Sequence, residues 1–243
     1  MLTFTKRAFR DLFEANGYYL RHRGVMPYGI DYMWDIKRLA EFEGLSVRTF
    51  FDVGANTGQT SERALSEFPA AEVIAFEPHP GTFAELQRLS KCQHFASHNI
   101  ALSDSNGIAN LFCNGNTRDS LVIAEPGAQG IKVNCVTIDL FCNQKAIRHI
   151  DVLKIDTEGA DLAVLRGAKG MLGDGSISFV YAEFAHFYGG KQGTSLQQIA
   201  DFLRPFGFHF IATYTEFVWV QVDDFCLWSN ALFATRIPAH RSG

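Results

Sequence analysis

The pattern of apolar and polar residues changes near residue 48. Before that point, a first predicted helix carries an apolar face formed by Leu2, Phe9, Leu12 and Phe13. A second predicted helix, over residues 32–43, ends at Gly44, a typical C-cap residue. We expect the first helix to dock on the core. The alternative is a helix at a membrane surface, beside a lipid-linked substrate.

From residue 49 onward, short apolar runs alternate with helical segments. The runs are typical of strands that are covered on both faces. Strands are predicted over residues 49–53, 72–76, 94–102, 150–155 and 177–184. Helices are predicted over residues 57–68, 80–90 and 161–171. This alternation predicts an α/β fold with a doubly wound, mostly parallel sheet and helices on both faces.

Two regions interrupt the alternation. Residues 107–137 contain two strand-like pieces separated by turn residues, which predicts an inserted hairpin. Strand-like runs over 208–214, 217–222 and 231–235 follow one another without helices, which predicts an antiparallel end to the sheet. We therefore divide the chain into an N-terminal helical appendage (1–47, a substrate lid or docking element), a cofactor-binding domain (48–236) and a tail (237–243).

Composition narrows the class of protein. The 243 residues carry a net charge of −4, so the global basic footprint of a nucleic-acid-binding protein is missing. The five cysteines show neither a C-x-x-C pair nor zinc-type spacing, which favours reduced thiols. Neither an export signal nor a membrane-spanning apolar run is present, so we expect a cytoplasmic protein. Peripheral membrane contact through the first helix stays open, and the oligomeric state is not predicted.

The most informative stretch joins the first predicted strand to the first helix of the alternating region. Asp52 ends the strand, Gly54 and Gly58 follow four residues apart, and Glu77 ends the second strand. In an open parallel sheet, ligands bind at the carboxyl ends of the strands. The glycines let the backbone pass close to a ligand, and the two oxygens of Glu77 suit the hydroxyls of a ribose.

Three nucleoside cofactors compete for this site. A phosphate-loop nucleotide lacks its Gly-Lys-Ser/Thr, and a dinucleotide would need G-x-G-x-x-G rather than the G-x-x-x-G found here. S-adenosylmethionine has a ribose and a carboxylate but no pyrophosphate, and it fits best. The alternative without a ligand is a glycine turn in which Asp52 and Glu77 serve only as caps.

Six motifs resemble the FkbM family of S-adenosylmethionine-dependent methyltransferases, in order and spacing, over about residues 49–235. They are Phe-Asp-Val-Gly-Ala-Asn-Thr-Gly-Gln-Thr-Ser (51–61), Ala-Phe-Glu-Pro (75–78), Asn-Ile-Ala-Leu-Ser-Asp (99–104), Thr-Ile-Asp (137–139), Leu-Lys-Ile-Asp-Thr-Glu-Gly-Ala-Asp (153–161) and Val-Leu-Arg-Gly-Ala (164–168). The resemblance implies the Rossmann-like class I fold, a seven-stranded sheet whose last strand is antiparallel. Asp161 stands where the family usually has Glu.

The resemblance also implies the residues that bind the cofactor. The methionine portion would be lined by Asp52, Gly54, Ala55, Asn56 and Gly58. Glu77, followed by Pro78, would hold the ribose. The turn from Ala101 to Asp104 would border the adenine, although Asp104 could instead begin the inserted hairpin. S-adenosylhomocysteine would be the product.

Methyl transfer to a hydroxyl needs an aligned acceptor and a base within hydrogen-bond reach. Four candidates fall at the same predicted sheet edge: Asp156, Glu158, Glu183 and His186. Each also has an alternative to a role as the base. Asp156 could instead bind the methionine amino group, and His186 could be a structural loop residue. Oxygen and imidazole ligands of this kind could hold a divalent cation, but the spacing does not demand one and none is expected.

These observations predict an O-methyltransferase for a hydroxyl on a glycan, glycolipid or secondary metabolite. The region around Asp156 lacks the Asn-Pro-Pro-Tyr/Phe of many amino-directed methyltransferases, which argues against a nucleic-acid base as acceptor. Two alternatives remain at this stage: a methyltransferase-like binding module without turnover, and a nicotinamide-dependent oxidoreductase. The identity of the acceptor does not follow from the sequence.

Overall fold

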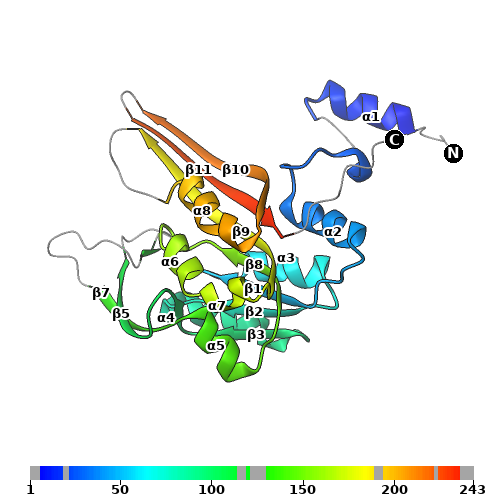
Figure 1. Ribbon diagram of the computed structural model, residues 1–243. Coiled ribbons are helices and arrows are strands. Elements are labelled where there is room, and N and C mark those ends of the chain that lie inside the picture. The colour runs from blue at the N-terminus through cyan, green and yellow to red at the C-terminus, as the bar shows by residue number, and fades with distance from the viewer. Residues whose placement is uncertain are drawn as a thin grey trace.

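The structure of the chain is a computed structural model (Figure 1). It describes residues 6–18, 22–113, 119–120, 130–188, 194–221 and 224–235. The predicted tail, 237–243, lies outside these residues.

A seven-stranded sheet forms the centre of the molecule (Figure 1). Its strands are β1 (Thr49–Val53), β2 (Glu72–Phe76), β3 (Phe95–His98), β8 (Ile150–Ile155), β9 (Ile177–Tyr188), β10 (His209–Gln221) and β11 (Asp224–Ala234). The order is β10-β11-β9-β8-β1-β2-β3, and β11 alone runs antiparallel to its neighbours β9 and β10. The predicted class I methyltransferase sheet, with an antiparallel last strand, is confirmed.

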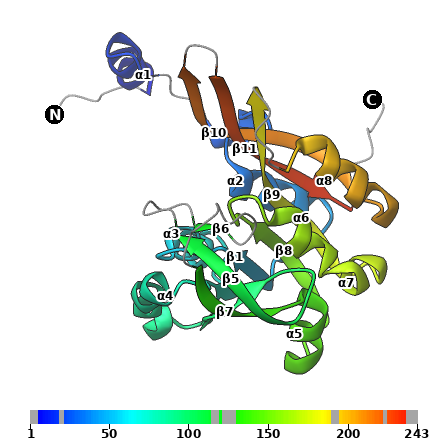
Figure 2. The same ribbon diagram turned by 90° about the vertical axis from the view of Figure 1, so that its left-hand side faces the viewer.

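Helices cover both faces of this sheet (Figure 2). One face carries α2 (Tyr32–Phe42), α3 (Gln59–Glu67) and α4 (Pro80–Leu86), which continues into the 3₁₀ turn η2 (Gln87–Lys91). The other carries α5 (Ile138–Lys145), α6 (Asp161–Arg166), α7 (Lys169–Gly173) and α8 (Leu196–Leu203), which leads into η3 (Arg204–Phe206). Alternate residues of each strand therefore enter one of two apolar layers, which explains why the strands read as continuous apolar runs.

A smaller sheet stands beside the main one, with the order β4-β7-β5-β6. It consists of β4 (Ala101–Leu102), β5 (Gly107–Cys113), β6 (Asp119–Ser120) and β7 (Gly130–Val136). The antiparallel β5–β7 pair is the predicted hairpin. The single strand predicted over 94–102 is wrong: β3 ends at His98, and the next two-residue strand pairs with β7 instead of with β2.

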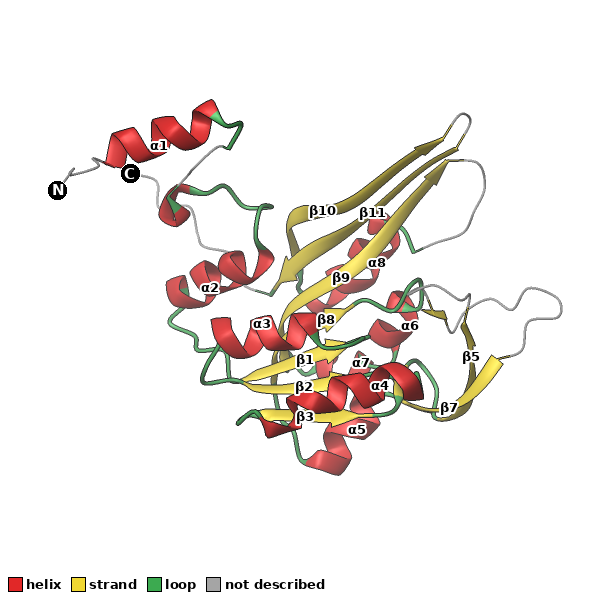
Figure 3. Cartoon of the chain, turned by 180° about the vertical axis from the view of Figure 1, so that it is seen from behind, coloured by secondary structure: helices red, strands yellow, loops and turns green. Residues whose placement is uncertain are grey.

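Other predicted boundaries also need correction. The helix predicted over 161–171 is two helices, because the chain turns at Gly167 between α6 and α7. The strand predicted to end at residue 184 continues to Tyr188, and the C-terminal strand pieces form two long strands. In Figure 3 these long strands, β9, β10 and β11, run past the ends of β8, β1 and β2. Helices α5 and α8 were not anticipated.

The N-terminal helices differ in how they meet the core. In α1 (Lys6–Ala15), Phe9 and Leu12 are each about half exposed, and Phe9 packs on Phe13 of the same helix with ring centroids 5.0 Å apart. Figures 1 and 2 both show α1 standing away from the sheet. The expectation of a first helix docked on the core is therefore wrong.

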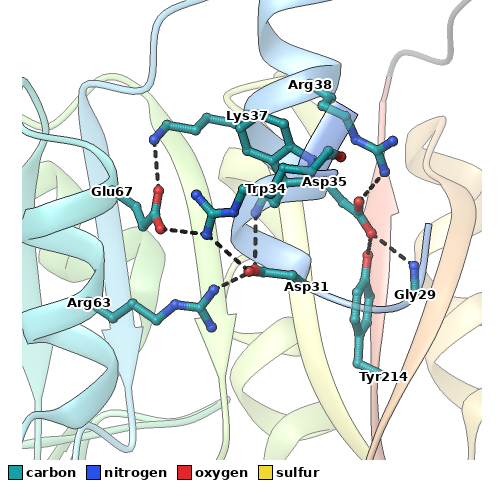
Figure 4. Close-up of polar contacts among 10 residues, drawn as sticks. Gly29, Asp31, Trp34, Asp35, Lys37, Arg38, Arg63, Glu67 and Tyr214 are labelled. Carbon is teal, nitrogen blue, oxygen red and sulfur yellow. Dashed lines mark hydrogen bonds and ion pairs between the residues drawn. The ribbon is translucent and has the colours of Figure 1, made fainter. Parts of the chain in front are cut away.

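Helix α2, by contrast, is part of the core. Met33 and Ile36 are fully buried against the sheet face that α3 also covers. A buried carboxylate, Asp35, ties the helix to β10, because it accepts hydrogen bonds from the Tyr214 hydroxyl (2.6 Å) and the Gly29 N–H (2.9 Å) and pairs with Arg38 (Figure 4).

A second polar group joins α2 to α3. Asp31 caps the first turn of α2 by accepting from the Trp34 N–H and also pairs with Arg63 of α3. Lys37 of α2 reaches Glu67 at the end of α3 (2.7 Å), as Figure 4 shows. The segment before the first strand is thus fixed to the sheet from residue 29 onward.

Candidate functional site

The candidate site lies where three neighbouring parallel strands end. Val53 of β1 is in register with Phe76 of β2 and with Ile155 of β8. The next residue of each strand therefore comes to the same edge of the sheet. These residues are Gly54, Glu77 and Asp156, and all three were predicted site residues.

The glycine turn is built against the protein itself. Gly54 has φ of +74°, and its N–H and that of Ala55 both donate to the Phe76 carbonyl at 3.0 Å. A Cβ at Gly54 would lie 1.9 Å from the carbonyl oxygen of Asp156. We expected this glycine to make room for a ligand; in the structure, the close neighbour is the backbone after β8.

Gly58 serves a similar purpose at the start of α3. It is the N-cap residue, with φ of +95°, and a Cβ there would come within 2.8 Å of methyl groups of Leu86 and Leu89. The helix begins at Gln59, two residues later than predicted. Ala55 is buried in the same small cluster. Close packing against other parts of the protein therefore requires glycine at both positions.

Glu77 holds the glycine turn from the second strand. Its side chain is buried, and its two oxygens accept from the N–H groups of Asn56 and His79, each at 2.9 Å. Asn56 has a left-handed φ of +50°, and the bond to Glu77 supports this uncommon conformation. The Asn99 amide binds the carbonyl oxygens of Glu77 and Pro78 at 2.8 and 2.9 Å. The carboxylate is thereby fixed at the sheet edge.

A buried lysine lies beneath the same edge. Lys154 stands opposite Asp52 in the β1–β8 register, and its ammonium lies 2.9 Å from the Asp52 carboxylate. It also donates to the Gly54 carbonyl at 3.1 Å and pairs with Asp156 at 3.5 Å. The other oxygen of Asp52 accepts from the Ser61 hydroxyl at 2.7 Å.

This arrangement changes how two of the predicted residues are understood. Asp52 is fully buried, with both oxygens engaged by Lys154 and Ser61, whereas Asp156 keeps 36% of its side chain exposed. Burial alone would lower the pKa of Lys154, but the carboxylates of Asp52 and Asp156 outweigh it and hold that pKa above its usual value. Lys154 was not singled out from the sequence. Its signal was a lone cation among the apolar residues Val152, Leu153 and Ile155.

The acidic candidates beyond β8 are joined by another buried carboxylate. Asp161 accepts from the Thr157 hydroxyl at 2.9 Å and from the Glu183 N–H at 3.1 Å. Burial, reinforced by the nearby charge of Asp156, raises the pKa of Asp161 to about 6. Asp161 was noted only as a departure from the family, yet it braces the turn that carries Glu158 against the strand that carries Glu183.

The candidate bases Glu158 and Glu183 are both partly exposed. Glu158 lies in the turn after β8 and has φ of +52°, which is unusual for a residue with a side chain. Glu183 lies within β9, one position beyond the register partner of Ile155. The backbone of His186 belongs to β9, but its side chain lies outside the described part of the structure.

The predicted adenine border lies at the smaller sheet. Ala101 is buried in β4, and Asp104 is exposed in the turn that leads to β5. Asp104 was expected either to border the adenine or to begin the inserted hairpin, and both interpretations refer to this turn. No group of three or more His, Cys, Asp or Glu that could hold a metal ion occurs among the described residues.

Two further motifs position the helices on the opposite face. Thr137 caps α5 through its hydroxyl, and Asp139 accepts from the N–H groups of Gly170 and Met171 at the start of α7. A Cβ at Gly167 would lie 2.0 Å from the Ser103 carbonyl oxygen. These motifs therefore support the scaffold.

The comparison with family models decides the assignment. Residues 52–210, well over half of the chain, match the model of the methyltransferase FkbM domain. The chain belongs to the FkbM methyltransferase family. Its methyl donor is S-adenosylmethionine, so the choice among the three nucleoside cofactors is settled, and the nicotinamide-dependent alternative is set aside.

Known proteins resemble this FkbM methyltransferase to different degrees. It is 26% identical over 175 residues to the 2-O-methyltransferase NoeI of Sinorhizobium fredii (strain NBRC 101917 / NGR234), covering 64% of this chain and 70% of that protein. Among solved structures, a putative RNA methyltransferase, PH1948, from Pyrococcus horikoshii has a TM-score of 0.45 at 16% identity, covering 85% of each chain. M. capricolum TrmK, solved with S-adenosylhomocysteine, has a TM-score of 0.43 at 12% identity, covering 82% of this chain and 67% of its own.

The described residues contain no helix that is both long and apolar enough to span a membrane.

Proposed function

We propose that this FkbM methyltransferase methylates a hydroxyl group on a glycan, a glycolipid or a sugar-containing secondary metabolite. The relative NoeI is named a 2-O-methyltransferase, which favours oxygen as the accepting atom. The observation that carries the proposal is the meeting of Gly54, Glu77 and Asp156 at one strand edge, with Glu183 on the adjoining strand.

The donor half of the site follows from the fixed carboxylates. Glu77 is held by two backbone N–H groups, and its two carboxylate oxygens suit the two hydroxyls of a ribose. Asp156 is partly exposed, and we assign it to the amino group of the methionine portion. Asp52 is fully enclosed, so its contribution is to hold Lys154 and, through it, the Gly54 turn.

The acceptor half requires a base and an aligned hydroxyl. S-adenosylmethionine supplies a methyl group on a sulfonium, and the hydroxyl must lose its proton as the carbon–oxygen bond forms. Asp156 already binds the Lys154 ammonium, so we assign the base to Glu183, whose backbone Asp161 fixes. Glu158 and His186 remain further candidates, and the N-terminal segment up to residue 47 is proposed to border the acceptor.

The test is to follow the methyl group into a product. The protein is incubated with deuteromethyl S-adenosylmethionine and a host extract divided into polysaccharide, glycolipid, small-molecule, protein and nucleic-acid fractions. After acid hydrolysis, mass spectrometry should find a deuteromethyl ether on a sugar. The Glu77→Ala variant is the control and should give none. Label confined to nucleic acid or protein would contradict the proposal.

A further inference from the structure

The unusual feature of the donor edge is Lys154, a charged side chain that is almost fully buried within the sheet. Lys154 is the second-to-last residue of β8, with Asp52 opposite it in register, and Asp156 directly follows the strand at ion-pair distance from the ammonium. The ammonium donates a hydrogen bond to the Gly54 carbonyl and forms ion pairs with the carboxylates of Asp52 and Asp156. One cation therefore contacts the turns that follow both β1 and β8.

A purely structural role would need only part of this arrangement. The fully buried Asp52 carboxylate supplies the counter-charge, and the Gly54 carbonyl accepts a hydrogen bond from the ammonium. Lys154 instead extends to Asp156, whose carboxylate is 36% exposed and opens onto the edge where Glu77 is fixed. The contact to the Gly54 carbonyl fixes the other side of the same edge.

We propose that Lys154 is a positioning residue for the methyl donor: it orients the Asp156 carboxylate and the Gly54 turn to receive the methionine portion of S-adenosylmethionine. The inference rests on the donor site proposed above. Lys154 acts through Asp156 and is itself enclosed, so it does not contact the donor. The role is distinct from that of Glu77, which is fixed by backbone N–H groups on the neighbouring strand.

The test separates positioning from stability by removing the charge in two ways. Lys154→Met leaves Asp52 buried without its cation and is expected to lower the melting temperature strongly. The double variant Asp52→Asn/Lys154→Met removes both charges of the buried pair and should recover most of that loss. Lys37→Met removes an ammonium that joins α2 to Glu67 of α3 and serves as the matched control.

Binding of S-adenosylhomocysteine, measured by calorimetry, gives the decisive readout. We expect the double variant to be stable yet to bind at least about tenfold more weakly than wild type, because Asp156 has lost its charged partner. Lys37→Met should bind as wild type does. A stable double variant with wild-type affinity would overturn the positioning role. Binding that is absent even in wild type would instead count against the donor site itself.

A further variant asks whether Lys154 acts through Asp156. Asp156→Asn should weaken binding in the wild-type background but add little in the Asp52→Asn/Lys154→Met background, because the carboxylate there is no longer held. Independent, multiplicative losses in the two backgrounds would mean that Lys154 does not act through Asp156, and would also overturn the inference.

Discussion

Replacing Gly54 with alanine tests how the donor edge is assembled. The new Cβ would lie 1.9 Å from the Asp156 carbonyl oxygen and 2.9 Å from its carbon. Both are backbone atoms, so no side-chain rotation relieves the contact. The turn after β1 must instead move away from the turn after β8. That movement would break the hydrogen bond that the Asp156 N–H donates to the Val53 carbonyl at 3.0 Å.

The expected loss can be divided into two parts. A non-glycine residue at φ of +74° costs about 1–2 kcal/mol in backbone strain. Losing the hydrogen bond between the two turns adds about 1 kcal/mol, and the residual overlap costs more. Gly54→Ala should therefore lower the free energy of unfolding by about 3 kcal/mol or more, which corresponds to a fall of roughly 6–12 °C in melting temperature.

Gly44→Ala is the matched control. Gly44 has φ of +67°, and no atom lies within 4 Å of its added Cβ, so only backbone strain applies. It should lose about 1–2 kcal/mol and bind S-adenosylhomocysteine normally. Urea unfolding and calorimetry of both variants supply the comparison. If Gly54→Ala were no less stable than Gly44→Ala and bound the product equally well, the close approach of the two turns would be refuted.

Three further predictions concern carboxylates at the donor edge and at the anchor of α2. Asp156→Ala and Glu183→Ala should stay folded, as circular dichroism would show, while turnover falls by about a hundredfold or more; full activity in both would place the chemistry elsewhere. Because the pKa of Asp161 is raised to about 6, the folded protein holds this proton more tightly than the unfolded chain, and stability should fall as pH rises from about 4 to 6. Asp161→Asn should remove that slope in urea unfolding at several pH values; an unchanged slope would rule out Asp161 as its source. Tyr214→Phe removes a 2.6 Å hydrogen bond to a buried carboxylate, and should cost about 1.5–3 kcal/mol and speed hydrogen exchange in α2; unchanged exchange would contradict the anchoring role.

The sequence predicted the fold well where its signals are local. The strands over 49–53, 72–76 and 150–155 are short apolar runs bounded by turn residues, and the structure has strands with these bounds. The antiparallel end of the sheet followed from strand-like runs without intervening helices. Helix α5 was missed because the motif at Thr137 was treated as part of a hairpin, although its hydroxyl is a helix cap.

The limits of the sequence lie in contacts between distant segments. A strand prediction over 94–102 could not show that Ala101 would pair with Cys135 of another sheet. Gly54 was singled out as a ligand-binding residue, but its close neighbour is the Asp156 carbonyl, about a hundred residues away in the chain. In the sequence, Lys154 was only one residue of the motif at 153–161. The strand register shows that it lies opposite Asp52.

The most direct test of the account is calorimetric titration of S-adenosylmethionine into the wild-type protein and Glu77→Gln. The account predicts one site in the wild type and an affinity at least about tenfold lower in the variant, because the neutral amide replaces a charged acceptor. Thermal unfolding of both proteins would confirm that each is folded at the titration temperature. A wild type that does not bind, or a folded Glu77→Gln variant that binds as tightly, would contradict the assignment of the donor site to this strand edge.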